Sequence, residues 1–400
     1  MTPTTLGEVS TLKAVPSDVR AGFTWLTGHR AAVLLAPALL YLLVRELGLL
    51  VVQAMAARWD KDVTKALTSW DGQWFLGIAE RGYGNVPPWL VDAFGRRDPS
   101  TALAFFPGYP TLVGWVDALP GVGSVGAGFT VSFVAGVCCA YGLERLGRAV
   151  SGGSRRVGLV LVVLFAASPM AIVLSMTYSE ALFCAYAAWA LVGVVERRWL
   201  LAGVCCASAG LVRPTAAALV LAVCLAALLA IRRREGWRPW VGAAIAPLGL
   251  VGYLGYVAVR TGRWDGWFAL QQRGWDSRFD GGAATWRFAK LILGEPRSVL
   301  ELATVWFLVG ALVLVVVCLR RRVEWPLVVY GVGVLAMDLG SNGLMNSKAR
   351  LLLPAFTLLV PVAVWLAGRR TGTVVAVLSG VAVFGTWFGA YAITAWQYAI

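Results

Sequence analysis

The stretch LATVWFLVGALVLVVVCL (302–319) is followed directly by three arginines, at positions 320–322. An uncharged apolar run of this length is long enough for a helix to cross the hydrocarbon core of a bilayer. Comparable runs of about 16 to 25 residues recur from one end of the chain to the other. They are too long and too evenly apolar for barrel strands, and a backbone in lipid must satisfy its own hydrogen bonds. The sequence therefore predicts an all-α, polytopic integral membrane protein.

The composition supports this class. Of the 400 residues, 59% are hydrophobic and only 14% are charged, whereas a soluble domain carries about a quarter charged residues. The formal net charge of +14 resides in short basic clusters between apolar runs, where membrane proteins use such clusters for orientation. We therefore predict a lipid bilayer and no nucleic acid as partner. The seven cysteines all fall in or at the ends of apolar runs, which is typical of small packing residues.

We predict about eleven transmembrane helices, within a range of roughly 10 to 13. The first apolar run is too long for a cleavable signal peptide, so residues 1–30 form a cytoplasmic segment and 31–400 a single transmembrane domain. Arg213-Pro214 separates two short runs, which are either two spans or one broken helix. The predicted spans lie near 31–54, 124–143, 157–175, 180–195, 199–212, 214–231, 240–259, 300–319, 324–340, 351–368 and 373–397.

Five short arginine clusters follow every second span, and all can therefore lie on the cytoplasmic side. The clusters occupy 145–156, 197–198, 232–238, 320–322 and 369–370.

This orientation places two long loops, 55–123 and 260–299, on the external side. The segment 102–119 within the first loop contains Pro107, Gly108 and Pro110. If this segment crossed the membrane, the arginine clusters that follow it would lie on the external side. We predict that it is a juxtamembrane or re-entrant helix. Both loops are rich in tryptophan, which prefers the membrane–water interface, so we expect them to lie against the external face of the bilayer.

The first loop contains SWDGQWFLGIAE (69–80), in which Trp70, Trp74 and Ile78 form an apolar stripe on a short helix. Asp71 lies in the first turn of that helix. It has two interpretations: a carboxylate that stabilises the helix N-terminus, or a general base at the membrane surface.

An external carboxylate near arginines suits the transfer of a sugar from a lipid phosphate. A sugar hydroxyl is a poor nucleophile and needs a base to accept its proton. A phosphate leaving group needs cations, because negative charge develops on its oxygens. Inverting transfer requires only one base, whereas a retaining enzyme needs a second carboxylate close by.

The motif resembles the first-loop signature of the GPI mannosyltransferase II (PIG-V-like) family, within the GT-C group of polyprenyl-phosphate-sugar-dependent glycosyltransferases. Further blocks that resemble this family follow in the same order, so that the resemblance extends over most of the chain. The blocks are WDGQWFLGIAERGYG (70–84), AFFPGYP (104–110), SPMAIVLSMTYSEALF (168–183), AGLVRPTAAALV (209–220), ALQQRGWDSRF (269–279) and NSKARLLLPAF (346–356).

The resemblance implies a GT-C-like fold with a long first external loop and a mannosyltransferase activity. The donor it implies is a polyprenyl-phosphate sugar, and the acceptor is an unknown glycan or lipid-linked molecule. Asp71 matches the catalytic aspartate, and Trp70, Trp74 and Tyr83 belong to the same motif. The family often has Arg before Trp-Asp, where this chain has Ser69. Asp60, in a second Arg-Trp-Asp, lacks the residues that follow and is interpreted as non-catalytic.

Other candidate site residues each have two interpretations. Glu80 is either a helix-surface charge or a ligand for the acceptor. Tyr178, Ser179 and Glu180 form either a helix cap or part of the cavity. Arg213 lies at membrane depth, where an arginine usually faces protein, water or a ligand.

Arg278 and Arg350 lie on the external side, against the positive-inside tendency. They are either surface arginines whose side chains reach the interface or ligands for a lipid phosphate, because a guanidinium matches phosphate oxygens in a bidentate fork. Gln271, Gln272 and Trp275 precede Arg278 and are expected to shape the same pocket.

The sequence shows no metal-binding cluster and no cofactor motif. His29, the only histidine, lies on the predicted cytoplasmic side, which excludes histidine catalysis on the external face. A transporter or flippase of a lipid-linked substrate is an alternative, but Glu46 and Asp338 are the only acids that fall well inside spans. A non-catalytic membrane assembly partner is a third. We expect the protein in the cell membrane.

Overall fold

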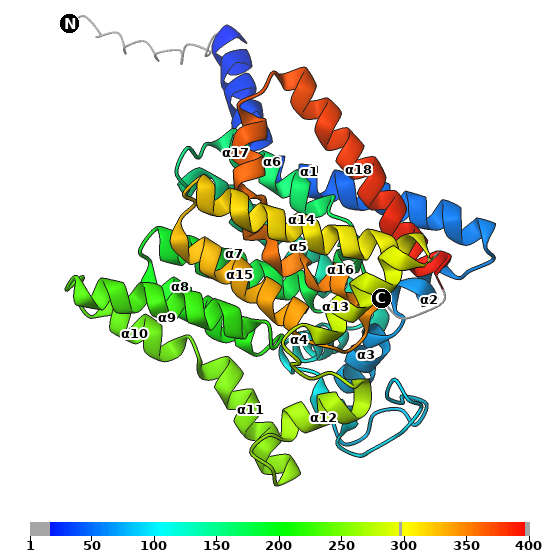
Figure 1. The fold of residues 1–400 in the computed structure, drawn as a ribbon. Coiled ribbons are helices and arrows are strands. Elements are labelled where there is room, and N and C mark those ends of the chain that lie inside the picture. The colour runs from blue at the N-terminus through cyan, green and yellow to red at the C-terminus, as the bar shows by residue number, and fades with distance from the viewer. Residues whose placement is uncertain (1–16, 296–297, 397–400) are drawn as a thin grey trace, which may run out of the picture.

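The computed structural model describes residues 17–295 and 298–396, with side chains from residue 31 onward. The described part of the chain is helical and has no β-strand, only an isolated bridge between Phe279 and Ser341. Figure 1 shows the helices packed side by side as one bundle. The all-α prediction is therefore confirmed. Residues 1–16 of the predicted N-terminal segment and the side chain of His29 lie outside the described residues.

Five helices are long and apolar enough to cross a membrane. In one of them, α10 and α11 follow each other with Pro247 at the break, because proline cannot donate the next helical hydrogen bond. The bounds are α1 Ser17–Arg58, α5 Ser124–Ala149, α10 Arg238–Ile245 with α11 Leu248–Thr261, α14 Val299–Arg320 and α18 Thr371–Thr394.

A sixth crossing would combine two helical pieces, Met345–Leu351 and Leu353–Ala367, which meet at an angle of 51°. The first piece contains α16 (Lys348–Leu351), and the second contains η4 (Leu353–Leu359) and α17 (Val360–Ala367). Pro354 and Pro361 lie at the starts of η4 and α17, where the missing N–H leaves no intrahelical bond unmade.

Shorter apolar helices complete the bundle. They are α6 Arg155–Ala166, α7 Glu180–Val195, α8 Trp199–Gly210, α9 Ala216–Arg232 and α15 Trp325–Gly340. Nearly all of α7 is buried, and its alanine, glycine and cysteine residues allow the surrounding helices to approach closely. Helices α8 and α9, in contrast, each expose apolar side chains on one face, such as Val204 and Leu221. The count of about eleven spans remains a prediction.

The alternative that one broken helix covers 199–231 is wrong. Helices α8 and α9 lie side by side in Figure 1 and form a hairpin. Arg197, just before α8, pairs with Glu235, just after α9, at 2.8 Å. The chain therefore turns back at Arg213-Pro214, which becomes the tip of the hairpin.

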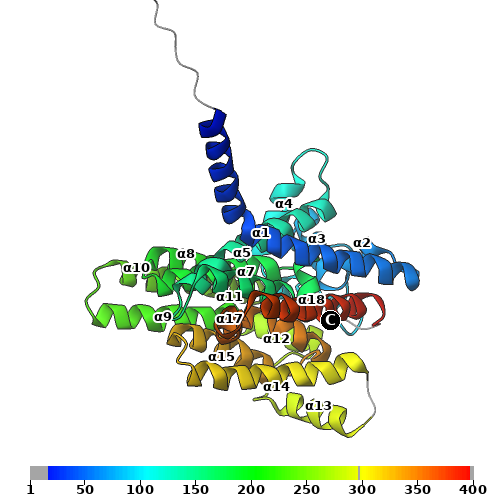
Figure 2. The same cartoon turned by 90° about the horizontal axis from the view of Figure 1, so that it is seen from above.

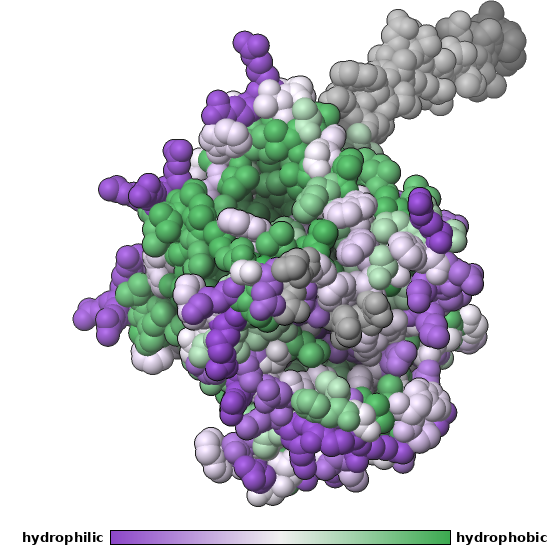
Figure 3. Space-filling view, turned by 45° about the vertical axis from the view of Figure 1, so that its right-hand side comes forward, coloured by the Kyte–Doolittle hydropathy of each residue, from purple (hydrophilic) through white to green (hydrophobic). Residues whose placement is uncertain are grey.

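The long helices present a broad apolar surface. Figure 3 shows apolar residues across the upper part of the molecule and hydrophilic residues gathered at its lower end and in projections from the left edge. Figure 2 shows α18 between α1 and α14, and Phe307 of α14 packs against Phe388 of α18 with ring centres 5.2 Å apart. Exposed leucine, valine and tryptophan residues lie along these helices, as expected for a lipid-facing surface.

The arginine clusters lie together at one end of the bundle. Arg145 forms an ion pair with Glu196, and Glu196 Oε2 also lies 3.2 Å from Arg198 Nε. Glu324, after the cluster at 320–322, accepts a hydrogen bond from Ser151 Oγ at 2.7 Å. These contacts join the connections that the orientation argument assigns to the same side.

The two long loops and the connection 341–350 lie together at the other end. Ala93 N donates to Gly274 O at 3.0 Å, and Asp280 N donates to Gly340 O at 2.8 Å. Backbone hydrogen bonds thus join the first loop to the second loop, and the second loop to the end of α15.

The loops contain helices of their own. These are α2 Val63–Leu67, α3 Asp71–Arg81, η1 Thr101–Ala104, α4 Gly108–Asp117, α12 Gly266–Trp275, α13 Ala283–Gly294 and η3 Met345–Ser347, while η2 Ala171–Ser175 follows α6. Helix α4 has ten residues, about 15 Å, which is half the thickness of the hydrocarbon core. It is too short to cross a membrane, in agreement with the prediction for 102–119.

We expect the loop face to be external. A cysteine introduced at Asn85 or Lys290, both exposed loop residues, should react with a membrane-impermeant maleimide in intact cells, whereas one at Arg233 should react only after lysis. Labelling of the Lys290 position only from the cytoplasm would overturn the orientation.

Candidate active site

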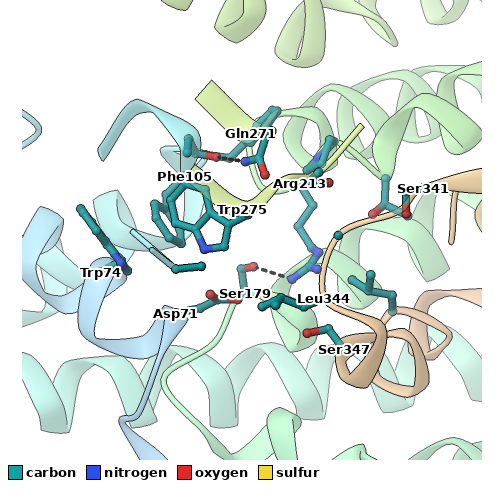
Figure 4. A pocket seen from close by; sticks show the side chains of 18 of the residues that line it. Asp71, Trp74, Phe105, Ser179, Arg213, Gln271, Trp275, Ser341, Leu344 and Ser347 are labelled. Carbon is teal, nitrogen blue, oxygen red and sulfur yellow. Dashed lines mark hydrogen bonds between the residues drawn. The ribbon is translucent and has the colours of Figure 1, made fainter. Parts of the chain in front are cut away.

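A cavity of about 750 Å³ opens where the loops meet the ends of the helices. Its walls come from the first loop, the tip of the α8–α9 hairpin, helix α12, the end of α15 and the segment that leads into α16. Figure 4 shows Asp71 and Trp74 on one side of this cavity and Ser341, Leu344 and Ser347 on the opposite side. Segments that are far apart in the sequence therefore share one site.

Asp71 is the first residue of α3, and its carboxylate faces the cavity. The residue before it, Trp70, has a φ of 53°, a left-handed conformation that is strained for a bulky side chain. The next residue, Gly72, lets α3 press against Thr177, whose Oγ1 would lie 2.5 Å from a Cβ at that position. This close contact fixes the start of α3 beside the segment that leads into α7.

The carboxylate of Asp71 does not cap the helix. Among the described residues its hydrogen-bond partner is Arg350, whose Nη1 lies 2.8 Å from Oδ2. The Asp71 side chain is 29% exposed, so a substrate in the cavity can reach it. The side chain thus makes no capping hydrogen bond, although it lies in the first turn of α3, and its carboxylate is accessible from the cavity.

Arg350 belongs to a chain of alternating charges. Its Nε lies 3.5 Å from Glu180 Oε1, and the same oxygen lies 2.7 Å from Arg213 Nη1. The four side chains from Asp71 to Arg213 have no net charge, and Glu180 is fully buried between the two arginines. Such an arrangement pairs the buried carboxylate with a cation on each side and fixes both guanidinium groups.

Residues 178–180 lie at the start of α7, with Ser179 at the N-cap position. Ser179 is the residue before α7, but its side chain makes no capping hydrogen bond. It accepts a hydrogen bond from Arg213 Nη1 at 3.1 Å (Figure 4). Arg213 thus faces protein and the cavity, because Pro214 ends the helical path and turns the chain at this position.

Tyr178 supports Arg350 from below. The guanidinium carbon lies 5.2 Å from the centre of the Tyr178 ring, a geometry that favours a cation over the ring face. Burial and the neighbouring charge of Asp71 raise the pKa of the Tyr178 phenol well above its ordinary value. The phenol therefore remains a donor, and it donates to Ser69 O at 3.2 Å.

Aromatic side chains form one wall of the cavity. Trp74 stacks on Phe105 with ring centres 5.2 Å apart, and Trp275 meets Phe105 edge to face at 5.5 Å. Gln271 and Trp267 both donate side-chain hydrogen bonds of 3.1 Å to Ala104 O. Helix α12 therefore holds the segment 104–106 in place, and the wall is rigid.

Arg278 is held at the rim by its backbone. Its N–H donates to Asn342 Oδ1 at 2.7 Å, and its carbonyl accepts from Asn342 N at 3.0 Å. The side chain is exposed and lines the cavity. Within the described ranges, Arg278 is the cavity-lining cation that has no carboxylate partner, whereas Arg213, Lys348 and Arg350 are all paired.

Five predicted site residues do not line the cavity. Glu80 accepts a hydrogen bond from Ser124 at the start of α5, which fits the helix-surface interpretation. Tyr83 donates to Phe105 O at 2.9 Å and so supports the aromatic wall from behind. Gln272 lines a separate surface hollow with Arg96 and Arg273. Tyr178 and Glu180 also lie behind the cavity wall, where they act through Arg350.

Sequence reasoning missed one pair of residues. Lys348 and Asp338 both line the cavity, and both are nearly fully buried. Lys348 falls in the block 346–356, and Asp338 is one of the two acids inside predicted spans. Neither fact alone indicated that the bend between α15 and α16 brings them together. No cluster of three or more metal-ligating side chains occurs among the residues that the structure describes.

Comparisons with known proteins place the fold. No protein-family model matches the chain, and no curated protein is significantly similar in sequence. The assignment to the PIG-V-like family therefore remains a prediction. Among solved structures, ArnT from Cupriavidus metallidurans bound to undecaprenyl phosphate is similar, with a TM-score of 0.52 and 16% sequence identity.

The similarity to ArnT covers 84% of this chain and 62% of ArnT, so the chain spans less than two thirds of its neighbour. The chain is thus an all-α, multi-pass membrane protein whose fold is similar to that of ArnT.

Proposed function

We propose that the protein is a membrane glycosyltransferase with Asp71 as general base. It transfers a mannosyl or related hexosyl residue from a polyprenyl phosphate to a lipid- or membrane-linked acceptor on the external face. The observation that carries this proposal is the pairing of Asp71 with Arg350 at the wall of a cavity of about 750 Å³. Undecaprenyl phosphate in the similar structure supports a donor of this class.

The proposed step forms one bond and breaks one. The acceptor oxygen attacks the anomeric carbon of the donor sugar, and its proton moves to the Asp71 carboxylate. The bond between the anomeric carbon and the phosphate oxygen breaks, and its electron pair remains on the phosphate. A single base on the attacking side is the arrangement that inverting transfer requires.

Two arginines suit the phosphate. The donor phosphodiester carries one negative charge, and Arg278 offers one cation without a carboxylate partner in the described structure. The departing lipid phosphate carries additional charge, which Arg350 is placed to offset because it also lines the cavity. Guanidinium groups bind phosphate oxygens through two parallel hydrogen bonds.

The aromatic wall suits the rest of the donor. Trp74, Phe105 and Trp275 present large apolar surfaces beside the acidic and basic groups. An isoprenoid chain or the C–H face of a sugar ring can pack on such surfaces. The cavity therefore combines an apolar wall for lipid with charged groups for the phosphate.

Purified protein in lipid nanodiscs should release polyprenyl phosphate from polyprenyl-phosphate mannose when a membrane acceptor fraction is supplied. Incorporation of labelled mannose into that fraction measures the transfer. Polyprenyl-phosphate glucose tests whether the sugar is mannose or another hexose. Failure to bind or consume either donor would exclude the proposed activity.

Arg278→Gln should weaken binding of polyprenyl phosphate. Loss of a hydrogen bond to a charged group costs roughly 1.5–3 kcal/mol, an affinity loss of about 10- to 100-fold. Because the side chain is exposed and unpaired in the described structure, the thermal midpoint should remain unchanged. Microscale thermophoresis with nanodisc-embedded protein measures the affinity.

Arg263→Gln is the matched control, because Arg263 lies in the same loop but pairs with Asp265 at 2.9 Å. Equal affinities of wild type and the Arg278 variant would remove Arg278 from the phosphate site.

A further inference from the structure

Asp338 is a buried carboxylate that the transfer step does not use. It lies two residues before the end of α15, is 3% exposed and lines the cavity. Neither carboxylate oxygen accepts a hydrogen bond from any residue that the structure describes. Its nearest cation is Lys348, whose Nζ lies 3.9 Å from Oδ1. A buried carboxylate without donors is costly, and a ligand in the adjoining cavity can supply those donors.

The ammonium group of Lys348 donates hydrogen bonds to two backbone carbonyls. Its Nζ donates to the carbonyl of Asp338 and to Ser341 O, the latter at 2.9 Å. An ammonium group has three donors, and these two bonds fix the turn that ends α15. Lys348 therefore lies near Asp338 without donating a hydrogen bond to its carboxylate oxygens.

A second polar group faces the same space. The hydroxyl of Ser347 is buried and, within the described residues, has no hydrogen-bond partner. Figure 4 places Ser347 and Ser341 on the side of the cavity opposite Trp74. The carboxyl group of Asp338 and the hydroxyl of Ser347 thus lie on one wall, and the aromatic rings form the other.

These groups identify the chemistry of the ligand. A carboxylate repels phosphate, and an isoprenoid chain has no donor to offer. Adjacent sugar hydroxyls can donate one hydrogen bond to each carboxylate oxygen. We propose that Asp338 and Ser347 form a subsite that binds hydroxyl groups of the donor sugar, an inference that rests on the proposed glycosyltransferase function.

The position of Arg278 favours the donor over the acceptor. Its backbone is hydrogen-bonded to Asn342, four residues after Asp338, and the neighbouring Phe279 bridges Ser341. The arginine proposed for the phosphate and the carboxylate proposed for the sugar therefore belong to one connected wall. Phosphate and sugar are directly bonded in the donor, so one molecule can satisfy both.

Deoxy donors test the subsite. A site built to hydrogen-bond a hydroxyl rejects an analogue that lacks it, because its own polar groups are then left unpaired. We expect wild-type protein to use a polyprenyl-phosphate sugar that lacks one particular hydroxyl at least tenfold less efficiently than the parent donor. The Asp338→Asn variant should use the parent donor with a kcat/KM at least tenfold below that of wild type. It should no longer discriminate between the parent donor and the analogue that lacks that hydroxyl.

The pattern of results separates the possibilities. Equal use of every deoxy donor by wild type, or full discrimination retained by Asp338→Asn, would overturn the subsite. Discrimination against deoxy acceptors alone, abolished by Asp338→Asn, would also overturn it, because it would assign the subsite to the acceptor. If the wild-type protein binds no polyprenyl-phosphate sugar at all, the proposed function itself is excluded.

Two further variants keep the test interpretable. Ser347→Ala removes only a hydroxyl, and it should reduce the same discrimination even if Asp338→Asn folds poorly. Glu46→Gln is the control, because it changes the other acid that falls inside a predicted span. Glu46 is exposed on α1 and does not line the cavity, so this variant should discriminate between donors as the wild-type protein does. Binding of sugar-free polyprenyl phosphate should be unchanged in Asp338→Asn, which confines the effect to the sugar.

Discussion

Asp71→Asn should lower kcat by about 10²- to 10⁴-fold, the usual contribution of a general base. Asparagine keeps the size and the helix-starting ability of aspartate but cannot accept the acceptor proton. It also frees Arg350 from one of its two carboxylates, so binding of polyprenyl phosphate should be equal or stronger. Single-turnover transfer of labelled sugar and equilibrium binding of polyprenyl phosphate measure the two effects separately.

Asp60→Asn is the control for this prediction. Asp60 belongs to the other Trp-Asp pair, is exposed and does not line the cavity. Its φ of 50° suits asparagine as well as aspartate, so the variant should fold and turn over normally. Full activity of the Asp71 variant would exclude the base, and an inactive Asp60 variant beside it would show that the other aspartate is catalytic.

Arg350→Lys should lower kcat/KM for the donor by about 10- to 100-fold. The planar guanidinium contacts Asp71 through Nη1 and approaches Glu180 through Nε, and a lysine ammonium cannot reproduce this fork. The loss of one charge-assisted hydrogen bond, worth roughly 1.5–3 kcal/mol, sets the expected size. The positive charge is retained, so the variant should still fold.

Arg350→Met separates charge from geometry. Removing the cation leaves Glu180 and Asp71 with one partner fewer, and breaking a buried pair costs about 3–5 kcal/mol of unfolding free energy. The thermal midpoint should therefore fall in Arg350→Met and not in Arg350→Lys. Arg81→Lys, an exposed change at the end of α3, is the activity control. Donor saturation by Arg350→Lys at wild-type concentrations would remove this arginine from the donor site.

Hydropathy and charge predicted the class of fold because lipid imposes strong constraints on length and composition. The apolar runs at 124–143 and 300–319 correspond to α5 and α14, and 102–119 contains a helix too short to cross. The hairpin at Arg213 was left open between two spans and one broken helix. Proline indicates an interruption of the helix, but the direction in which the chain continues depends on tertiary packing.

Candidate residues could be predicted where they belong to a local sequence motif. They could not be predicted where tertiary packing brings distant residues together. Asp71 follows a strained tryptophan in a motif with a clear polar pattern. The Lys348–Asp338 pair depends on the bend between α15 and the pieces that follow it, which no local pattern indicates. Glu80 and Gln272 have suitable side chains on suitable helices, but each points away from the cavity, because a rotation of about 100° per residue decides which face a helical side chain occupies.

The separation of Asp71 and Arg350 along the chain has a consequence for biosynthesis. The two residues are 279 positions apart, and a ribosome adding about 5–20 residues per second needs roughly 15 to 60 s to cover that interval. During this time α3 has already left the ribosome, while the guanidinium that orients its aspartate has not been made. The base acquires its partner only when nearly the whole chain has been inserted, so nascent protein should remain catalytically silent until synthesis is almost complete.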